Sequence, residues 1–250
     1  MSLKLTSKIN LGLESKTMQR NSNSFTDLII SIIVPSVILM KFSGPEDLGP
    51  QLALIVALAF PISLGVYELV RYRKTNYFAI LGLVSVLLTG GIGLLKLDTQ
   101  WLAVKEAAIP AILGIVVVLS AKLGVPLIKT LLFNKAVLDT DKISRELEAN
   151  DSTEAFEGQL IRATYLFGGT FFFSATMNYL LATWIVTSPS GSPAFNEELG
   201  RLTLLSYPMI ALPCMVMMIA IGYLLWRRLH QMTGLSFEEV MASSPSKDEE

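Results

Sequence analysis

Six long apolar blocks run through this sequence, and they constrain its fold more than any other feature. They cover approximately residues 25–42, 48–70, 77–95, 99–121, 163–186 and 202–226. A helix needs about 20 apolar residues to cross a hydrocarbon core about 30 Å thick. Backbone groups inside that core have no water to bind, and the blocks lack the alternation of a membrane β-strand. We therefore expect an all-α, polytopic membrane protein with about six transmembrane helices.

Lysine and arginine are distributed unequally between the predicted loops. The two ends of the chain, the second loop and the fourth loop carry most of them, whereas the opposite side keeps only Lys41, Lys96, Lys105 and Arg201. Cations in short loops stay on the cytoplasmic side, so both termini are predicted to be cytoplasmic. The first block has no small-residue cleavage site after it and is expected to remain as an anchor.

The apolar blocks and the predicted orientation divide the chain into three parts. They are a polar cytoplasmic tail (1–24), a six-helix transmembrane domain (25–228) with a cytoplasmic loop at about 134–160, and a flexible acidic cytoplasmic tail (229–250).

A charged patch lies at the start of the fourth block. The run from Ala107 to Ala121 spans only about 22 Å as a helix, so the helix must begin earlier, with Asp98 as the N-cap. Lys105 is then expected to extend toward the headgroups, while Glu106 points toward other helices or a wet crevice. Glu106 is either a structural polar group at the membrane edge or an ion or substrate contact beside the kink at Pro110.

Small and polar residues mark two further candidate positions. Gly90, Gly91 and Gly93 lack the Lys-Ser or Lys-Thr pair of a phosphate loop, so they are predicted to serve helix packing, with Ser174 on the fifth block. Asn178 lies deep in the fifth block, and we expect it to form an interhelical hydrogen bond or, alternatively, to belong to a transport site.

The residue inventory argues against several classes of function. Cys214 and His230 are each the only residue of their type, so no disulfide within the chain and no cysteine-based metal cluster is expected. A net charge of −1 gives no support for nucleic-acid binding. Zincin, nucleophile-elbow and P-loop motifs are missing, so we predict a protein that is not an enzyme and has no cofactor.

Two polar segments lie between the later blocks. The stretch from Asn134 to Gln159 is acidic, and Ile143 and Leu147 stand four residues apart in it; it is either a short surface helix that docks a partner or a solvated linker. The stretch "TSPSGSPAFNEELG" is rich in Pro, Gly and Ser and predicts a turn between helices.

Several short motifs resemble one known family in their order and spacing. They are "ALIVALAF" running to "YRK" with Arg73 and Lys74, the "GG" pair followed by an acidic-aromatic loop that ends at Lys105, "PLI" at Pro126, and Asn178 beside Tyr179. Over about residues 53–228 the chain is similar to the bacterial intracellular septation protein A family, the inner membrane-spanning proteins also called YciB, or to a close branch of it. It departs from the family at Val104 and Val125 and in its longer terminal and fourth-loop segments.

The resemblance implies a multi-pass protein of the bacterial inner membrane with no known catalytic activity. It also implies a link to septation, cell elongation and envelope integrity through contacts with other envelope proteins. The expected partners are therefore the lipid bilayer and membrane or envelope proteins, with an oligomer possible. A small transporter of solutes or lipids is the alternative, based on the proline and glycine breaks, Glu106 and Asn178.

Overall fold

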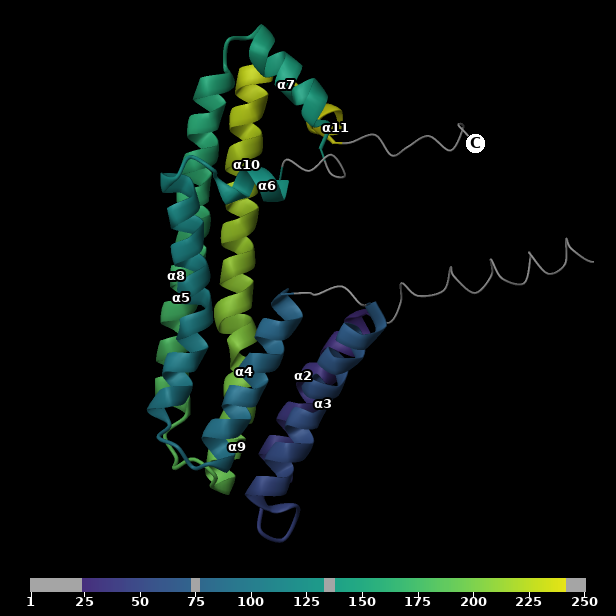
Figure 1. Ribbon diagram of the computed structural model, residues 1–250, viewed down its shortest axis with the longest axis vertical. Coiled ribbons are helices and arrows are strands. Elements are labelled where there is room, and N and C mark those ends of the chain that lie inside the picture. Colours follow the sequence, from purple (N-terminus) through teal and green to yellow (C-terminus); the bar gives the residue numbers. More distant parts are fainter. Residues whose placement is uncertain (1–23, 73–76, 133–137, 242–250) are drawn as a thin grey trace, which may run out of the picture. The chain divides into compact units, whose positions relative to one another are not determined.

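The computed structural model describes residues 24–72, 77–132 and 138–241, and within them it is built from helices without any strand (Figure 1). The helices are α2 (Ser24–Lys41), α3 (Gly49–Tyr72), α4 (Tyr77–Leu94), α5 (Gln100–Lys122), α6 (Leu127–Leu132), α7 (Thr140–Ala149), α8 (Thr153–Ile185), α9 (Pro193–Ser206), a π-helical turn η1 (Tyr207–Ala211), α10 (Leu212–Thr233) and α11 (Phe237–Val240). The predicted all-α class is confirmed.

Three of the described helical segments are long and apolar enough to cross a membrane. They are Gly49–Tyr67, Gln100–Lys122 and Pro193–Thr233, the last of which continues through α9, η1 and α10. Two shorter apolar helices cover Ile32–Lys41 and Ile80–Leu94. These segments agree with the predicted membrane class, because a span requires about 20 apolar residues.

The described residues form two compact units, and the first comprises residues 24–97 and 187–204. The side chain of Asn196 on α9 is fully buried in it. The Asn196 amide nitrogen donates to Ser43 Oγ (3.0 Å) and to the Pro50 carbonyl (2.7 Å), at the turn between α2 and α3. These bonds join α9 to that turn, so the segment expected to be a simple turn contains the start of a packed helix.

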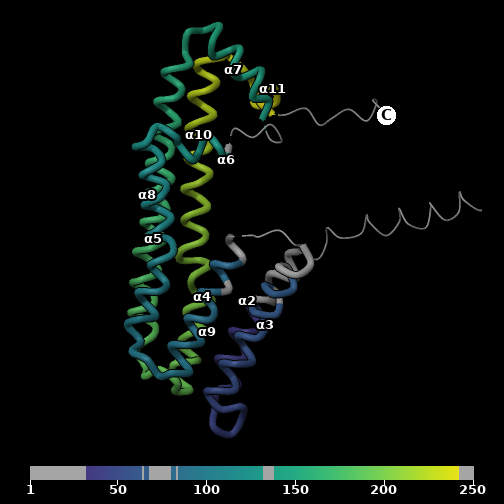
Figure 2. The backbone as a smooth tube through the Cα atoms, in the orientation of Figure 1, coloured from purple at the N-terminus to yellow at the C-terminus, as the bar shows by residue number. Residues whose placement is uncertain are grey.

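The second unit comprises residues 98–186 and 205–241 of the described chain. Helices α5 and α8 lie side by side in it (Figure 2). A Cβ added at Gly168 would lie 2.7 Å from Val118 Cγ2, and one added at Gly114 would lie 3.2 Å from Phe171 Cβ. Small residues therefore allow the two backbones to approach closely, as is common between membrane helices.

A small helical cap closes one end of the second unit, near the top of Figure 1. Helix α7 turns back onto the ends of α8 and α10, and α11 follows α10 and contacts α7. The core of the cap includes Ile143, Leu147 and Val240, and it is continuous with buried residues of α8 and α10 such as Phe156 and Leu229. The apolar face of α7 predicted from Ile143 and Leu147 is thus used inside the protein.

In the cap, the structure differs from two segment boundaries that we expected from the sequence. The loop at about 134–160 contains α7 and the first turns of α8 in its described part. The expected tail from residue 229 begins inside α10, and the described chain continues through α11 to Met241. Residues 1–23, almost all of the first predicted tail, and residues 242–250, the last part of the second, lie outside the described residues.

The π-helical turn at Tyr207–Ala211 has a local cause in the sequence. Pro213 has no N–H, and its ring would clash with the carbonyl four residues earlier in a regular α-helix. Insertion of a π turn at this point lets the helix continue beyond the proline instead of ending there.

Candidate functional site

Lys105 and Glu106 form an ion pair on α5, with Lys105 Nζ 2.7 Å from Glu106 Oε1. The Lys105 side chain is 8% exposed and the Glu106 side chain 29%. The outward orientation predicted for Lys105 is therefore wrong: Lys105 is the more buried partner, whereas Trp101 and Val104 are exposed. The N-cap of α5 is Thr99, one residue later than predicted, and Asp98 Oδ1 accepts a hydrogen bond from the Gln100 amide at 2.8 Å.

The predicted packing glycines differ in their surroundings. A Cβ on Gly90 would lie 2.7 Å from Leu58 Cδ1, and one on Gly93 would lie 2.5 Å from Leu54 Cδ2. Gly91 has nothing within 4 Å of such a Cβ. Gly90 and Gly93 thus lie against α3 at a close helix contact, and Gly91 does not.

Asn178 and Ser174 interact within α8. The Asn178 amide nitrogen donates to the Ser174 carbonyl at 2.8 Å and to Ser174 Oγ at 3.3 Å. Both bonds stay inside one helix, in place of the interhelical bond expected from the sequence. The pair is partly buried.

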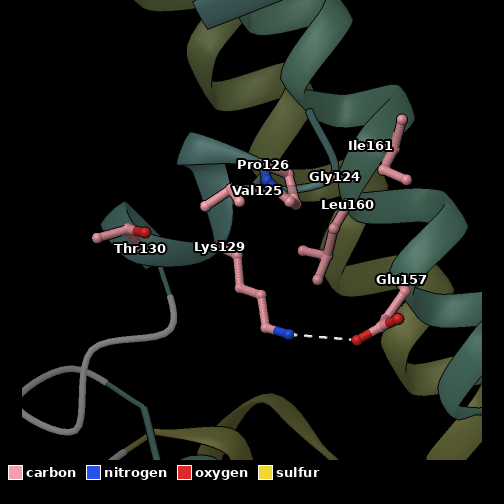
Figure 3. Close-up of a pocket in the computed structure, with 8 residues that line it drawn as sticks. All are labelled: Gly124, Val125, Pro126, Lys129, Thr130, Glu157, Leu160 and Ile161. Atoms are coloured by element: carbon pink, nitrogen blue, oxygen red, sulfur yellow. Dashed lines mark hydrogen bonds and ion pairs between the residues drawn. The ribbon is translucent and has the colours of Figure 1, made fainter. Parts of the chain in front are cut away.

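The family motifs are only partly described. Arg73 and Lys74 lie outside the described residues. Pro126 is buried in a surface groove between α6 and α8, beside the exposed side chain of Val125 (Figure 3). The groove contains the ion pair of Lys129 Nζ and Glu157 Oε1, at 3.3 Å. Both side chains are about half exposed, so this pair contributes little to stability.

The surface of the cap is acidic. Five exposed carboxylates lie on α7, in the turn after it, and at the starts of α8 and α11: Asp141, Glu148, Asp151, Glu154 and Glu238. Among the cations of the cap, Lys142 is paired with Glu239 at 3.1 Å. This face can attract a basic partner through its charge.

The contact between α7 and α11 contains one strongly shifted carboxyl group. The pKa of Glu239 is lowered from 4.5 to about 2, first because the Ser236 amide donates to its carboxylate at 2.9 Å and second because Lys142 donates to it. Ser236 and Glu239 form a capping box at the start of α11. The amide of Asp139 adds a bond to the Val240 carbonyl at 3.0 Å.

An aromatic group lies on α10 where the cap begins. Trp226 stacks on His230 with the ring centroids 5.8 Å apart, and Phe237 meets Trp226 edge-on at 6.0 Å. His230 Nδ1 lies 2.6 Å from the Leu235 carbonyl. The lone histidine is thus held by local contacts that join α10 to the segment before α11.

No group of three or more His, Cys, Asp or Glu side chains among the described residues is arranged to hold a metal ion. Comparison of the chain with models of protein families, with curated proteins and with solved structures finds no match. The site must therefore be interpreted from its own geometry.

The sequence did not single out Asn196, Arg162 or Arg228 as candidate site residues. Asn196 is a fully buried polar residue in a segment whose composition indicates a turn. Arg162 and Arg228 line one groove between α8 and α10, although each stands at the end of a separate apolar block. Both arginines stand at the predicted cytoplasmic end of their apolar blocks, and this shared position is the sequence signal that could have indicated that they lie close together.

Proposed function

We propose that this chain is a non-enzymatic, multi-pass protein of the bacterial inner membrane that supports septation, cell elongation or envelope integrity by contacting other envelope proteins. The family resemblance supports the biological process, and the apolar helices support the membrane location. The folded acidic cap is the observation on which the contact function rests. A simple linker between two membrane helices does not need to bury apolar side chains against the ends of α8 and α10, as α7 does.

We place six crossings in α2, α3, α4, α5, α8 and the α9–α10 helix, with both termini and the cap in the cytoplasm. Helix α8 has 33 residues and is about 50 Å long, so it exceeds a hydrocarbon core of about 30 Å. Its first ten residues, 153–162, extend beyond the apolar block and carry the cap. Arg162 and Arg228 favour the cytoplasmic side for this end.

The surface that we propose for a partner is the charge of the cap, because the apolar face of α7 is used inside the protein. Ile143 is fully buried and Leu147 is 5% exposed, so both are committed to the core of the cap. Glu148, Asp151 and Glu154 are exposed around the turn from α7 to α8. The proposed partner surface is therefore a basic cytoplasmic segment of an elongation or division protein.

Photocrosslinking in native membranes tests this proposal. A photoreactive residue in place of Glu148 is expected to capture a small set of elongation or division proteins, because Glu148 is exposed on the acidic turn. The same residue in place of exposed Lys96, in the loop between α4 and α5, is the control and should not capture them. The paired substitutions D151K and E154K should abolish capture from position 148 without changing the amount of protein.

Two results would contradict the contact function. One is recovery of the same proteins from positions 148 and 96. The other is a deletion strain with unchanged cell shape, division and envelope sensitivity.

A transporter is the second candidate, and the Lys105–Glu106 pair supports it. Ionisable residues within a membrane helix often belong to a transport pathway, and this pair lies on a helix long and apolar enough to cross. Under this proposal E106Q and N178L abolish complementation of a deletion strain while the protein level is retained. Full complementation by the double variant would exclude it.

A further inference from the structure

A groove between α8 and α10 combines two cationic side chains with an apolar wall. Gln159, Arg162 and Arg228 line its polar part, and Leu166, Leu224 and Leu225 line its apolar part. Both helices belong to the second unit and contact each other along this region. The groove is open at the surface, so a ligand can enter from the side.

The two arginines are not neutralised by carboxylates within the described part of the chain. Arg228 donates to the side-chain oxygen of Gln231 at 3.3 Å, and no ion pair involves Arg162 or Arg228 among these residues. Nearby Lys129 and Lys142, in contrast, are each paired with a glutamate. The groove therefore concentrates uncompensated positive charge beside an acidic cap.

The position of the groove relative to the proposed membrane determines which part of a lipid lies beside it. Arg162 directly precedes the apolar block of α8, and Arg228 is the second residue after that of α10. Both side chains consequently lie where the hydrocarbon core meets the headgroups. A guanidinium group binds a phosphate through two parallel hydrogen bonds, and the leucines below suit an acyl chain.

We propose that this groove binds an anionic phospholipid, with its phosphate between Arg162 and Arg228 and an acyl chain along Leu166 and Leu224. Basic pockets between membrane helices on the cytoplasmic side recognise lipids of this class. The inference rests on the membrane placement proposed above and is independent of any protein partner.

Tryptophan quenching by brominated lipid tests the site when the reporter is introduced at Leu224, whose side chain lines the groove. The full-length W101F/W184F/W226F/L224W variant has its sole tryptophan at position 224. The Trp101 and Trp184 side chains are 62% and 66% exposed, and Leu224 is 48% exposed, so a larger ring has room there. The protein is reconstituted into phosphatidylcholine vesicles in which one lipid in five is phosphatidylglycerol. Bromine is placed either on the phosphatidylglycerol or on an equal fraction of the phosphatidylcholine.

Brominated phosphatidylglycerol is expected to quench the tryptophan at position 224 about twofold more than brominated phosphatidylcholine. The pair R162Q/R228Q should bring the ratio of the two quenching values close to one. R227Q is the matched control, because Arg227 is an exposed neighbour on α10 that does not line the groove, and it should leave the ratio unchanged. R162K/R228K keeps the charge but loses the bidentate geometry, so its ratio should fall between these values.

Equal quenching by the two lipids in the parent protein would overturn the proposal. A ratio lowered as much by R227Q as by R162Q/R228Q would also overturn it, since the effect would then come from general surface charge. The measurement involves no envelope protein, so a negative result leaves the crosslinking test of the cap unaffected.

Discussion

At the scale of single residues, glycines determine how closely α5 and α8 approach. Gly168 on α8 faces Val118 on α5, whereas a Cβ added at its neighbour Gly169 would have nothing within 4 Å. The sequence drew attention to Gly90, Gly91 and Gly93 because they are close together. Gly114 and Gly168 are far apart in the sequence, and their role becomes visible only when the two helices are placed side by side.

The substitution G168A tests this contact. A Cβ there would lie 2.7 Å from a methyl group of the β-branched Val118, which cannot move aside easily. We expect a loss of about 1–3 kcal/mol, as for other overpacked contacts. Thermal denaturation of the purified protein in detergent measures the effect.

G169A is the matched control, because it makes the same chemical change one residue later. It should be neutral or slightly stabilising, since alanine favours a helix more than glycine does. Equal destabilisation by both variants would show that the close contact between α5 and α8 is not the cause.

The Lys105–Glu106 pair shows a limit of prediction at this scale. Apolar residues surround α5 on most sides, so hydrophobic periodicity does not define which face is buried. Helical spacing alone put Glu106 inward and Lys105 outward. The structure has Lys105 as the more buried side chain, with Glu106 supplying its counter-charge.

At the scale of elements, the cap depends on the apolar face of α7. Ile143 is 0% exposed and adjoins Ser144, which is exposed. I143A is expected to destabilise the cap by about 2–5 kcal/mol, as is typical of a large buried residue replaced by alanine. Faster hydrogen exchange of the α7 amides would report this loss.

S144A serves as the control, because it replaces an exposed side chain on the same turn and should change cap stability by no more than about 0.5 kcal/mol. If I143A exchanged as slowly as S144A, the α7 face would not be part of the cap core.

The contact of α11 with α7 is predicted to weaken in acid. Because the folded state lowers the pKa of Glu239 to about 2, its stabilising effect is complete above 4.5 and disappears as the pH falls toward 2. Phe237 packs on Trp226, so release of α11 should increase quenching of Trp226 by acrylamide in the W101F/W184F variant, which retains Trp226 as its sole tryptophan.

E239Q identifies the contribution of this carboxyl group. It should remove the part of the acid response that lies between pH 4.5 and about 2. An identical response in E239Q and the parent protein would assign the transition to other carboxyl groups.

A helix at α7 was one of two alternatives predicted from the sequence, since Ile143 and Leu147 are four residues apart on an acidic background. The position of that helix was not predicted. The partners of Ile143 come from α8, α10 and the segment after α10, and such distant contacts leave no local periodicity in the chain. The turn expected before α9 is present at residues 187–192, but the start of α9 in the same stretch was not predicted, because burial of Asn196 depends on contacts with the region where α2 meets α3.

At the scale of the whole molecule, the helical membrane class was the most predictable feature. Long apolar blocks have few alternatives to a membrane helix, and three described segments are long and apolar enough to span one. The number of crossings is less accessible, because α8 mixes apolar residues with Asn178 and several hydroxyl groups. Function is least accessible, since it depends on surfaces formed by separate blocks.

Cysteine accessibility in intact cells is the most direct test of the proposed membrane arrangement. In a C214A background, single cysteines replace the exposed residues Glu46, Lys96, Ser144 and Ala194. With six crossings and a cytoplasmic cap, a membrane-impermeant maleimide should label positions 46, 96 and 194 in cells whose outer membrane is open. Position 144 should react only after the inner membrane is permeabilised. Labelling of position 144 before permeabilisation, or protection of position 46, 96 or 194, would contradict this arrangement.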